Sequence, residues 1–230
     1  MIVSKTMIYM IDLYLYLLKK RKASIDEIIR DLRISREVVI EKIHVIKDHI
    51  NISNEIIEVK NPLFLAIFLI KQGVSFKQVS RYLDWRDFER FSAEILSAHG
   101  YVVINNFRLT KPVMLEVDVI GIDQGSGRGI IIDCKHWSRG VHRSALIEIA
   151  SKHIERVRKL LKHLSWAKTK WRYFKFLKEA IPLIVTLTTP SIRFYENTLI
   201  VSIQELNQVL NDIYVVLDVF GIKPIKIKNI

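Results

Sequence analysis

The sequence predicts a two-part α+β protein, with a helical domain first and an α/β domain after it. Up to about residue 60, apolar residues recur at the spacing of amphipathic helices, whereas after Trp85 a helical segment is followed by short apolar runs typical of strands. The chain has 230 residues, of which 50% are hydrophobic, so each part can bury a core. We expect an N-terminal domain at 1–60, a helical connector at 61–84 and a second domain at 85–230.

Three helices and one strand are predicted in the N-terminal domain. The first helix carries an apolar stripe, the second begins at the capping box Ser24–Glu27, and the third is capped by Ser35. A strand is expected at 55–60. This order is typical of a winged helix, a fold that often reads duplex DNA through its third helix. Acidic residues outnumber basic ones between Ser24 and Lys60, so DNA reading and a role in dimerisation or scaffolding both stay open.

The net charge of +12, from 36 Lys and Arg against 24 Asp and Glu, makes a polyanion the first partner to consider. The single cysteine, Cys134, excludes an internal disulfide and a thiolate zinc site, which is typical of a reducing cytosol, so we expect a cytoplasmic protein. The apolar runs at 7–18 and 63–70 are shorter than the roughly 20 residues of a spanning helix, so no membrane association is expected.

Charged side chains interrupt two apolar runs in the second domain. The runs at 115–122 and 130–135 are predicted strands joined by a glycine-rich turn. Because side chains alternate along a strand, Asp133 and Lys135 share one face and Cys134 points to the other. The sequence therefore predicts a pair of opposite charges at the end of a buried strand.

The register of this hairpin brings a second carboxylate to the pair. If Asp123 pairs with Arg128 across the turn, Asp118 lies opposite Asp133. Opposed carboxylates repel each other, and a divalent cation removes that repulsion. Oxygen ligands of this kind suit Mg²⁺, which uses one or two protein carboxylates together with substrate phosphate. The arrangement predicts phosphodiester hydrolysis, with a surface ion pair at the strand ends as the purely structural alternative.

The helix expected before the hairpin, at 86–99, offers a third carboxylate. Glu89 lies at the edge of the buried stripe of this helix and can point toward the sheet. Glu94 shares a row with Arg90, where an i, i+4 ion pair on the surface accounts for it. We therefore select Glu89 as the third acidic residue of the site.

Several short motifs, in order along the chain, resemble one nuclease family. They are Phe88-Glu89-Arg90, Ile95-Leu96, Gly100-Tyr101, Val117-Asp118 and Asp133-Cys134-Lys135. Together they resemble the PD-(D/E)XK nuclease superfamily, nearest to Mrr-type restriction endonucleases and archaeal Holliday junction resolvases, over about Trp85 to Leu210. The resemblance implies a restriction-endonuclease-like α/β domain with a mixed central sheet. Val117 departs from the pattern, because many members have proline there.

The resemblance also implies a role for each residue of the site. Asp118 and Asp133 would bind Mg²⁺ with the backbone carbonyl of Cys134, and Mn²⁺ is expected to substitute. Lys135 would orient or activate the attacking water. Glu89 would hold a metal-bound water or a second ion.

Most of the excess positive charge lies in a helical stretch predicted at 145–180, where phosphate contacts are expected. Basic residues close to the predicted site are further candidates for contacts to DNA. The DNA-binding candidates are Arg139, His142 and Arg143 after the second strand, Lys152 and Arg156 in the helical stretch, and Arg108 and Lys111 before the first strand.

The sequence thus predicts a metal-dependent DNA endonuclease of restriction type that acts on duplex or branched DNA. A homodimer is expected, because cutting both strands requires two active sites and the chain carries one. Two alternatives stay open: a structure-selective repair nuclease such as a junction resolvase, and a non-catalytic DNA-binding protein with the same fold. The intact set Glu89, Asp118, Asp133 and Lys135 favours catalysis over the last alternative.

Overall fold

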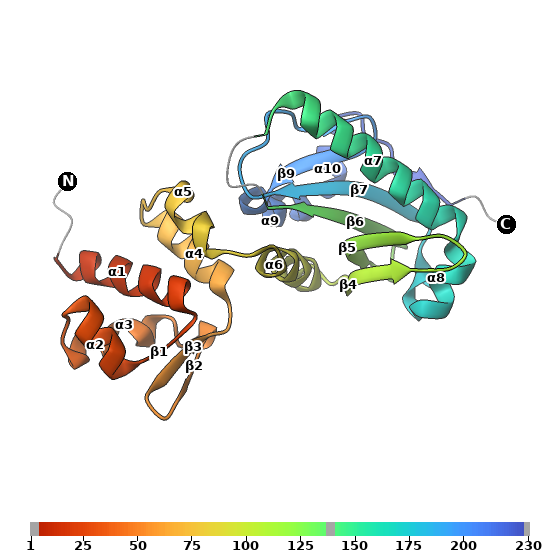
Figure 1. Ribbon diagram of the computed structural model, residues 1–230. Helices are drawn as coiled ribbons and strands as arrows, with labels where there is room; N and C mark the ends of the chain where they lie inside the picture. Colours follow the sequence, from red (N-terminus) through yellow and green to blue (C-terminus); the bar gives the residue numbers. More distant parts are fainter. Residues whose placement is uncertain (1–4, 137–140, 228–230) are drawn as a thin grey trace. The chain divides into compact units, whose positions relative to one another are not determined.

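The computed structural model describes residues 5–136 and 141–227. Its contacts divide the chain into two compact units, Met1–Asp87 and Phe88–Ile230, each described here by itself (Figure 1). In the described residues, no helix combines the length and the apolar character needed to cross a bilayer.

The first unit joins short helices to a small antiparallel sheet. Its elements are α1 (Lys5–Lys20), β1 (Lys22–Ser24), α2 (Ile25–Leu32), α3 (Arg36–Val45), β2 (Ile50–Ser53), β3 (Ile56–Val59), α4 (Pro62–Lys71) and α5 (Phe76–Val79). The sheet has the order β1-β3-β2. The predicted start of the second helix is confirmed, because the Ser24 hydroxyl accepts a hydrogen bond of 3.1 Å from the Glu27 amide. The winged-helix assignment stays a prediction.

Helix α4, which falls in the predicted connector, packs inside the first unit. Tyr14 of α1 is fully buried and lies edge-on to Phe68 of α4, with ring centroids 5.4 Å apart. The Tyr14 hydroxyl donates a hydrogen bond of 2.8 Å to the carbonyl oxygen of Lys42 in α3, so one side chain links three helices. The division into a domain at 1–60 and a connector at 61–84 therefore stays a prediction, and the contacts group both segments together.

The second unit is built on a mixed sheet, as the resemblance to restriction-endonuclease-like nucleases implies. Its elements are α6 (Trp85–Ala98), β4 (Val102–Leu109), β5 (Leu115–Ile122), β6 (Arg128–Lys135), α7 (Arg143–Lys162), α8 (Leu164–Lys170), the 3₁₀ helix η3 (Arg172–Phe176), β7 (Glu179–Thr186), β8 (Phe194–Tyr195), β9 (Thr198–Ser202), α9 (Ile203–Asn211), α10 (Ile213–Val219) and β10 (Ile225–Lys226). The strand order is β4-β5-β6-β7-β9-β8, and β10 pairs with β7. Strands β4 to β6 are antiparallel, whereas β6, β7 and β9 are parallel.

The helical stretch predicted at 145–180 is divided in the structure. It forms α7, α8 and η3, and its last two residues already belong to β7. Helix α7 is capped by His163, whose φ of −110° leaves the helical region, and α8 is capped by Trp171, which is extended. The long α7 crosses one face of the sheet (Figure 1).

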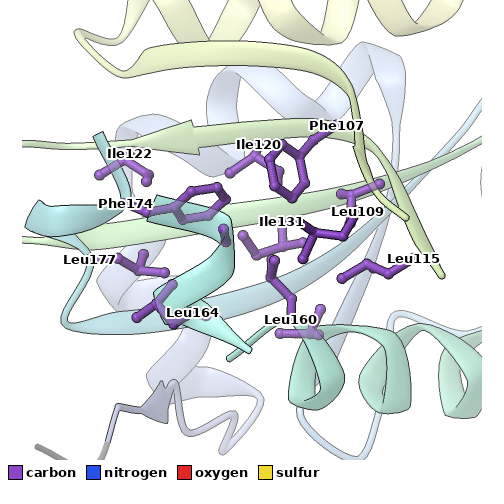
Figure 2. Close-up of a cluster of buried hydrophobic side chains, with 14 residues drawn as sticks. Phe107, Leu109, Leu115, Ile120, Ile122, Ile131, Leu160, Leu164, Phe174 and Leu177 are labelled. Atoms are coloured by element: carbon purple, nitrogen blue, oxygen red, sulfur yellow. The ribbon is translucent and has the colours of Figure 1, made fainter. Parts of the chain in front are cut away.

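A hydrophobic cluster joins α7, α8 and η3 to the sheet. Figure 2 shows Phe174 of η3 and Leu160 of α7 among Ile120, Ile131 and Phe107 of the strands. Phe174 and Phe107 are 5.0 Å apart in an edge-on arrangement, and both are buried. This packing fixes α7 against β5 and β6, the two strands that carry the predicted site.

A capping box at α9 gives a pH-dependent contribution to stability. Glu205 accepts hydrogen bonds from the Ser202 amide and from Arg193, with both guanidinium contacts at 2.7 Å. The Arg193 hydrogen bond is the largest cause that lowers the pKa of Glu205, to about 2. Because both side chains are partly exposed, we expect Glu205→Gln to lower the free energy of unfolding by about 1–2 kcal/mol at pH 7.

The lowered pKa sets the direction of the pH dependence. The stabilisation by Glu205 is present above the unfolded pKa of 4.5 and is lost as the pH falls toward 2, so wild type and variant should converge in acid. Urea unfolding at pH 7 and pH 3 measures this difference. Glu196→Gln, which removes an exposed ion pair of 4.0 Å, is the control and should change stability little. Equal losses in both variants would contradict the assignment.

Candidate active site

The hairpin of β5 and β6 has the register predicted from its turn. The Asp123 amide donates to the carbonyl of Arg128 at 2.9 Å, and the ladder runs from the pair Ile122–Gly129 to the pair Val119–Ile132. The ladder then stops, and Asp118 accepts a hydrogen bond of 2.7 Å from the Cys134 amide through its side-chain Oδ2. The carboxylate of Asp118 therefore lies against the strand segment that carries Asp133 and Lys135.

The alternation of β5 shifts by one residue at Asp118. Ile120 and Ile122 belong to the same buried cluster as Leu115 and Val117, although their numbers differ in parity. On β4, Asn106 lies at the level of Asp118 and has a φ of 51°, in the left-handed region that asparagine tolerates better than most residues. The two strands change together, so their register is kept on both sides of the shift. Backbone of this kind concentrates at functional sites.

Asp133 is buried between two cations. Its side chain is 3% exposed, with the Lys135 ammonium 2.7 Å from Oδ2 and the Arg156 guanidinium 2.5 Å from Oδ1. Burial alone would raise the pKa of Asp133, but the facing His153, Lys135 and Arg156 together hold it below its usual value. The contact between Lys135 and Asp133 confirms that these two side chains share a face of the strand.

His153 of α7 lies close enough to Asp133 to act on its charge. Its Nε2 donates to the carbonyl of Ile131 at 2.9 Å, and the ring is almost fully buried. Burial lowers the pKa of His153 to about 4. The imidazole is therefore neutral near pH 7, and its charge acts on Asp133 only in acid. Near pH 7, Lys135 and Arg156 supply the positive charge that balances Asp133.

Glu89 of α6 lies beside Asp118, as the helical pattern predicts. It is 7% exposed, and its Oε2 has no hydrogen-bond partner among the described residues. Burial and then the charge of Asp118 raise the pKa of Glu89 to about 7, although a hydrogen bond from Asn106 opposes the shift. Glu94 forms the predicted surface pair with Arg90 at 3.0 Å.

The donor set fits a hard divalent cation, held by few protein ligands. Asp118 and Glu89 both have raised pKa values, and the buried Glu89 Oε2 lacks a partner, so a cation would stabilise the charged forms of both. Within the described ranges, no three His, Cys, Asp or Glu side chains converge on one point where they could hold a metal. This arrangement suits an ion that takes one or two carboxylates and completes its shell with water and substrate.

A comparison with protein families decides the assignment of this segment. Residues 80–164 match the restriction endonuclease family Mrr_cat. The matched segment, hereafter the Mrr_cat segment, contains Glu89, Asp118, Asp133 and Lys135 as well as Arg156. The resemblance to restriction-endonuclease-like nucleases that the motifs predict is therefore confirmed over these residues.

Solved structures give weaker similarities to the chain. One is the restriction endonuclease FokI, with a TM-score of 0.41 and 16% identity over 89% of this chain and 44% of that chain. Another is protein VC1899 from Vibrio cholerae, with a TM-score of 0.33 and 12% identity over 94% of this chain and 53% of that chain. The chain thus spans about half the length of these structures. The comparison with curated protein sequences gives no match.

One cleft, lined by residues of the Mrr_cat segment, gathers three of the predicted DNA-binding residues. Arg108, Lys152 and Arg156 line it, together with Lys159, Glu116 and Glu155. The cleft has a volume of about 550 Å³ and lies between α7 and the ends of β4 and β5. Arg108 is paired with Glu116 at 2.8 Å and Lys152 with Glu148 at 2.5 Å, which partly neutralises both cations. Both basic side chains are more than half exposed.

The other predicted DNA-binding residues lie elsewhere. His142 and Arg143 are exposed at the start of α7, and Lys111 is exposed in the connection between β4 and β5. None of the three lines the cleft of Arg156. Arg139 lies outside the described residues.

The structure adds residues that the sequence did not single out as part of the acidic site. Arg156 was predicted as a DNA contact, and the structure places it on Asp133 as well. His153, whose charge acts on Asp133, and Asn106, which hydrogen-bonds Glu89, were not predicted. The one available signal is the spacing of His153 and Arg156, which places both on adjacent turns of one helix close to its buried stripe.

Removing the Arg156 charge should destabilise the protein. Breaking a buried ion pair costs more than breaking an exposed one, but Arg156 is one-third exposed and Lys135 remains beside Asp133, so we expect Arg156→Gln to cost about 1–2 kcal/mol at pH 7. Arg158→Gln on the same helix removes only an exposed pair of 4.0 Å and is the matched control. Urea midpoints measure both, and equal shifts would show that Asp133 does not depend on Arg156.

Proposed function

We propose that this chain is a metal-dependent DNA endonuclease that hydrolyses phosphodiester bonds, with restriction-like, Mrr-type activity. The observation that supports it is the grouping of Asp118, Asp133 and Lys135 on two neighbouring strands, beside Glu89, inside the Mrr_cat segment. Two raised carboxylate pKa values at this point are typical of a site built for ligand chemistry.

The chain's own residues suit this reaction in distinct ways. Asp118 and Asp133, with the Cys134 carbonyl, would hold Mg²⁺, for which Mn²⁺ would substitute. When bound, the cation would supply Lewis-acid polarisation of the phosphate and a lower pKa for water. Lys135 is held by Asp133 and would place positive charge where the transition state becomes more anionic. Glu89, with a pKa of about 7, would accept a proton from water or hold a second ion.

We also propose that the chain works as a homodimer on duplex or branched DNA. Each chain carries one acidic site, whereas cutting both strands requires two. The N-terminal unit, whose helices α1 to α3 accompany a three-stranded sheet, would act as a winged helix that binds DNA or joins the two copies.

The experiment is cleavage of a panel of supercoiled plasmid, linear duplex, single-stranded, flap and four-way-junction DNA. Each substrate is tested with Mg²⁺, with Mn²⁺ and with EDTA, and a Lys135→Ala sample purified identically controls for contaminating nuclease. Metal-dependent cleavage of plasmid or duplex that Lys135→Ala lacks is the expected result. Selective cleavage of junctions or flaps would instead assign a structure-selective repair nuclease. DNA binding without cleavage under every metal would assign a non-catalytic DNA-binding protein.

A further inference from the structure

A second basic groove lies on the surface of the second unit, apart from the cleft of Arg156. It has a volume of about 990 Å³, at the upper end of the range for small-ligand pockets. Six cations line it: Arg158, Lys162, Lys168, Lys175 and Lys226 from four elements, and Lys178 from the connection between η3 and β7. Its other lining residues are apolar apart from Ser165, and none is acidic.

The two grooves flank helix α7 on different sides. Arg156 lines the first cleft, whereas Arg158 lines the second groove, and residues two apart on a helix point about 200° away from each other. The buried stripe of α7, which includes Val157 and Leu160, faces the sheet between them. The second groove is therefore separated from the acidic site by the exposed ridge of α7.

The charges of this groove are hardly balanced within the protein. Among the described residues, the one ion pair of these cations joins Arg158 to Glu196 at 4.0 Å. The side chains of Arg158 and Glu196 are 58% and 50% exposed. The five lysines of the groove are exposed and make no ion pair with any of the described residues. Like charges collected on one concave surface oppose folding, so stability does not explain them.

We propose that this groove binds the sugar-phosphate backbone of a nucleic acid segment beyond the scissile bond. The inference rests on the proposed nuclease function and extends it to the path of the substrate. Lysines from α7, α8, η3 and β10 suit an extended polyanion better than a single phosphate, because they come from several elements around a groove of about 990 Å³. Duplexes long enough to pass α7 should therefore bind more tightly than short ones.

The test measures binding in EDTA, so that it does not depend on cleavage. Lys168→Gln and Lys175→Gln remove single groove charges, and Lys223→Gln, an exposed lysine close to β10 that does not line the groove, is the matched control. Anisotropy with duplexes of about 12 and 40 base pairs is followed over a salt series. On the long duplex, each groove variant should bind about 5- to 10-fold more weakly at 0.1 M salt and lose about 1 from the slope of log K against log salt.

On the short duplex, the groove variants should bind like Lys223→Gln. The inference is overturned if the groove variants match Lys223→Gln on the long duplex, or if they lose affinity equally on both lengths. It is also overturned if they bind duplex normally but lose affinity for polyglutamate, since the groove would then fit an acidic protein segment. If the groove variants lose affinity only for the long duplex but the wild type cleaves no DNA, the proposed DNA-binding role of the groove stands and only the nuclease proposal is overturned.

Discussion

Asp133→Asn should lower the rate of metal-dependent DNA cleavage by about 10³-fold, which corresponds to about 4 kcal/mol of transition-state stabilisation. Asp133 is 2% exposed and faces the carboxylate of Asp118, with Lys135 at 2.7 Å. The substitution keeps the size of the side chain but removes its negative charge. Both the hold on a cation and the position of the Lys135 ammonium depend on that charge, so both are lost together. Initial rates on the preferred substrate of the panel measure the effect.

DNA binding separates this loss from a failure to fold. In EDTA, Asp133→Asn should bind DNA at least as tightly as the wild type, because one negative charge near the phosphates is removed. Glu94→Gln neutralises a carboxylate in the surface pair with Arg90 and should cleave at the wild-type rate. If Asp133→Asn cleaves normally, or if Glu94→Gln fails in the same way, the acidic site is not where the chemistry occurs.

Phe174→Ala should lower the free energy of unfolding by about 3–5 kcal/mol, the range for truncating a buried aromatic residue. Phe174 is fully buried and packs edge-on against Phe107 at 5.0 Å and Trp171 at 5.2 Å. Its loss leaves a cavity in the close-packed cluster that Figure 2 shows. Urea unfolding of the variant and the wild type measures the difference.

The neighbouring Tyr173→Ala is the control for Phe174→Ala. Tyr173 is half-buried, and its ring contacts Trp171 at 5.5 Å from the outside of the cluster. We expect the free energy of unfolding of this variant to fall by about 1 kcal/mol, since the Tyr173 ring buries less apolar surface than the Phe174 ring. Equal losses at the two positions would show that η3 does not close the core as described.

Local rules were enough to predict the acidic hairpin. The turn between Asp123 and Arg128 determines the register, and strand alternation places Asp133 beside Lys135. The helical period distinguishes the buried Glu89 from the surface pair at Glu94. Each of these relations joins residues that are close in sequence or linked by one turn, so the periodic pattern of the sequence is sufficient to predict them.

Relations between distant elements could not be predicted in the same way. The shift at Asp118 is accompanied by the left-handed backbone of Asn106 on another strand, and no periodic pattern marks it. Arg156 reaches Asp133 only because the cluster around Phe174 fixes how α7 lies on the sheet. The breaks at His163 and Trp171 were missed because basic helix formers on both sides hide them.

At Cys134 the backbone of β6 is held by a side chain instead of by the neighbouring strand. On its other edge the strand continues to pair with β7 as far as Lys135 and Thr186. On the side of β7 this part of β6 is therefore held by sheet pairing, whereas on the side of β5 the backbone at Cys134 is held by the Asp118 carboxylate. The Cys134 amide proton consequently reports on Asp118: its exchange with solvent and its chemical shift follow the charge of that carboxylate, whichever ion or proton occupies it.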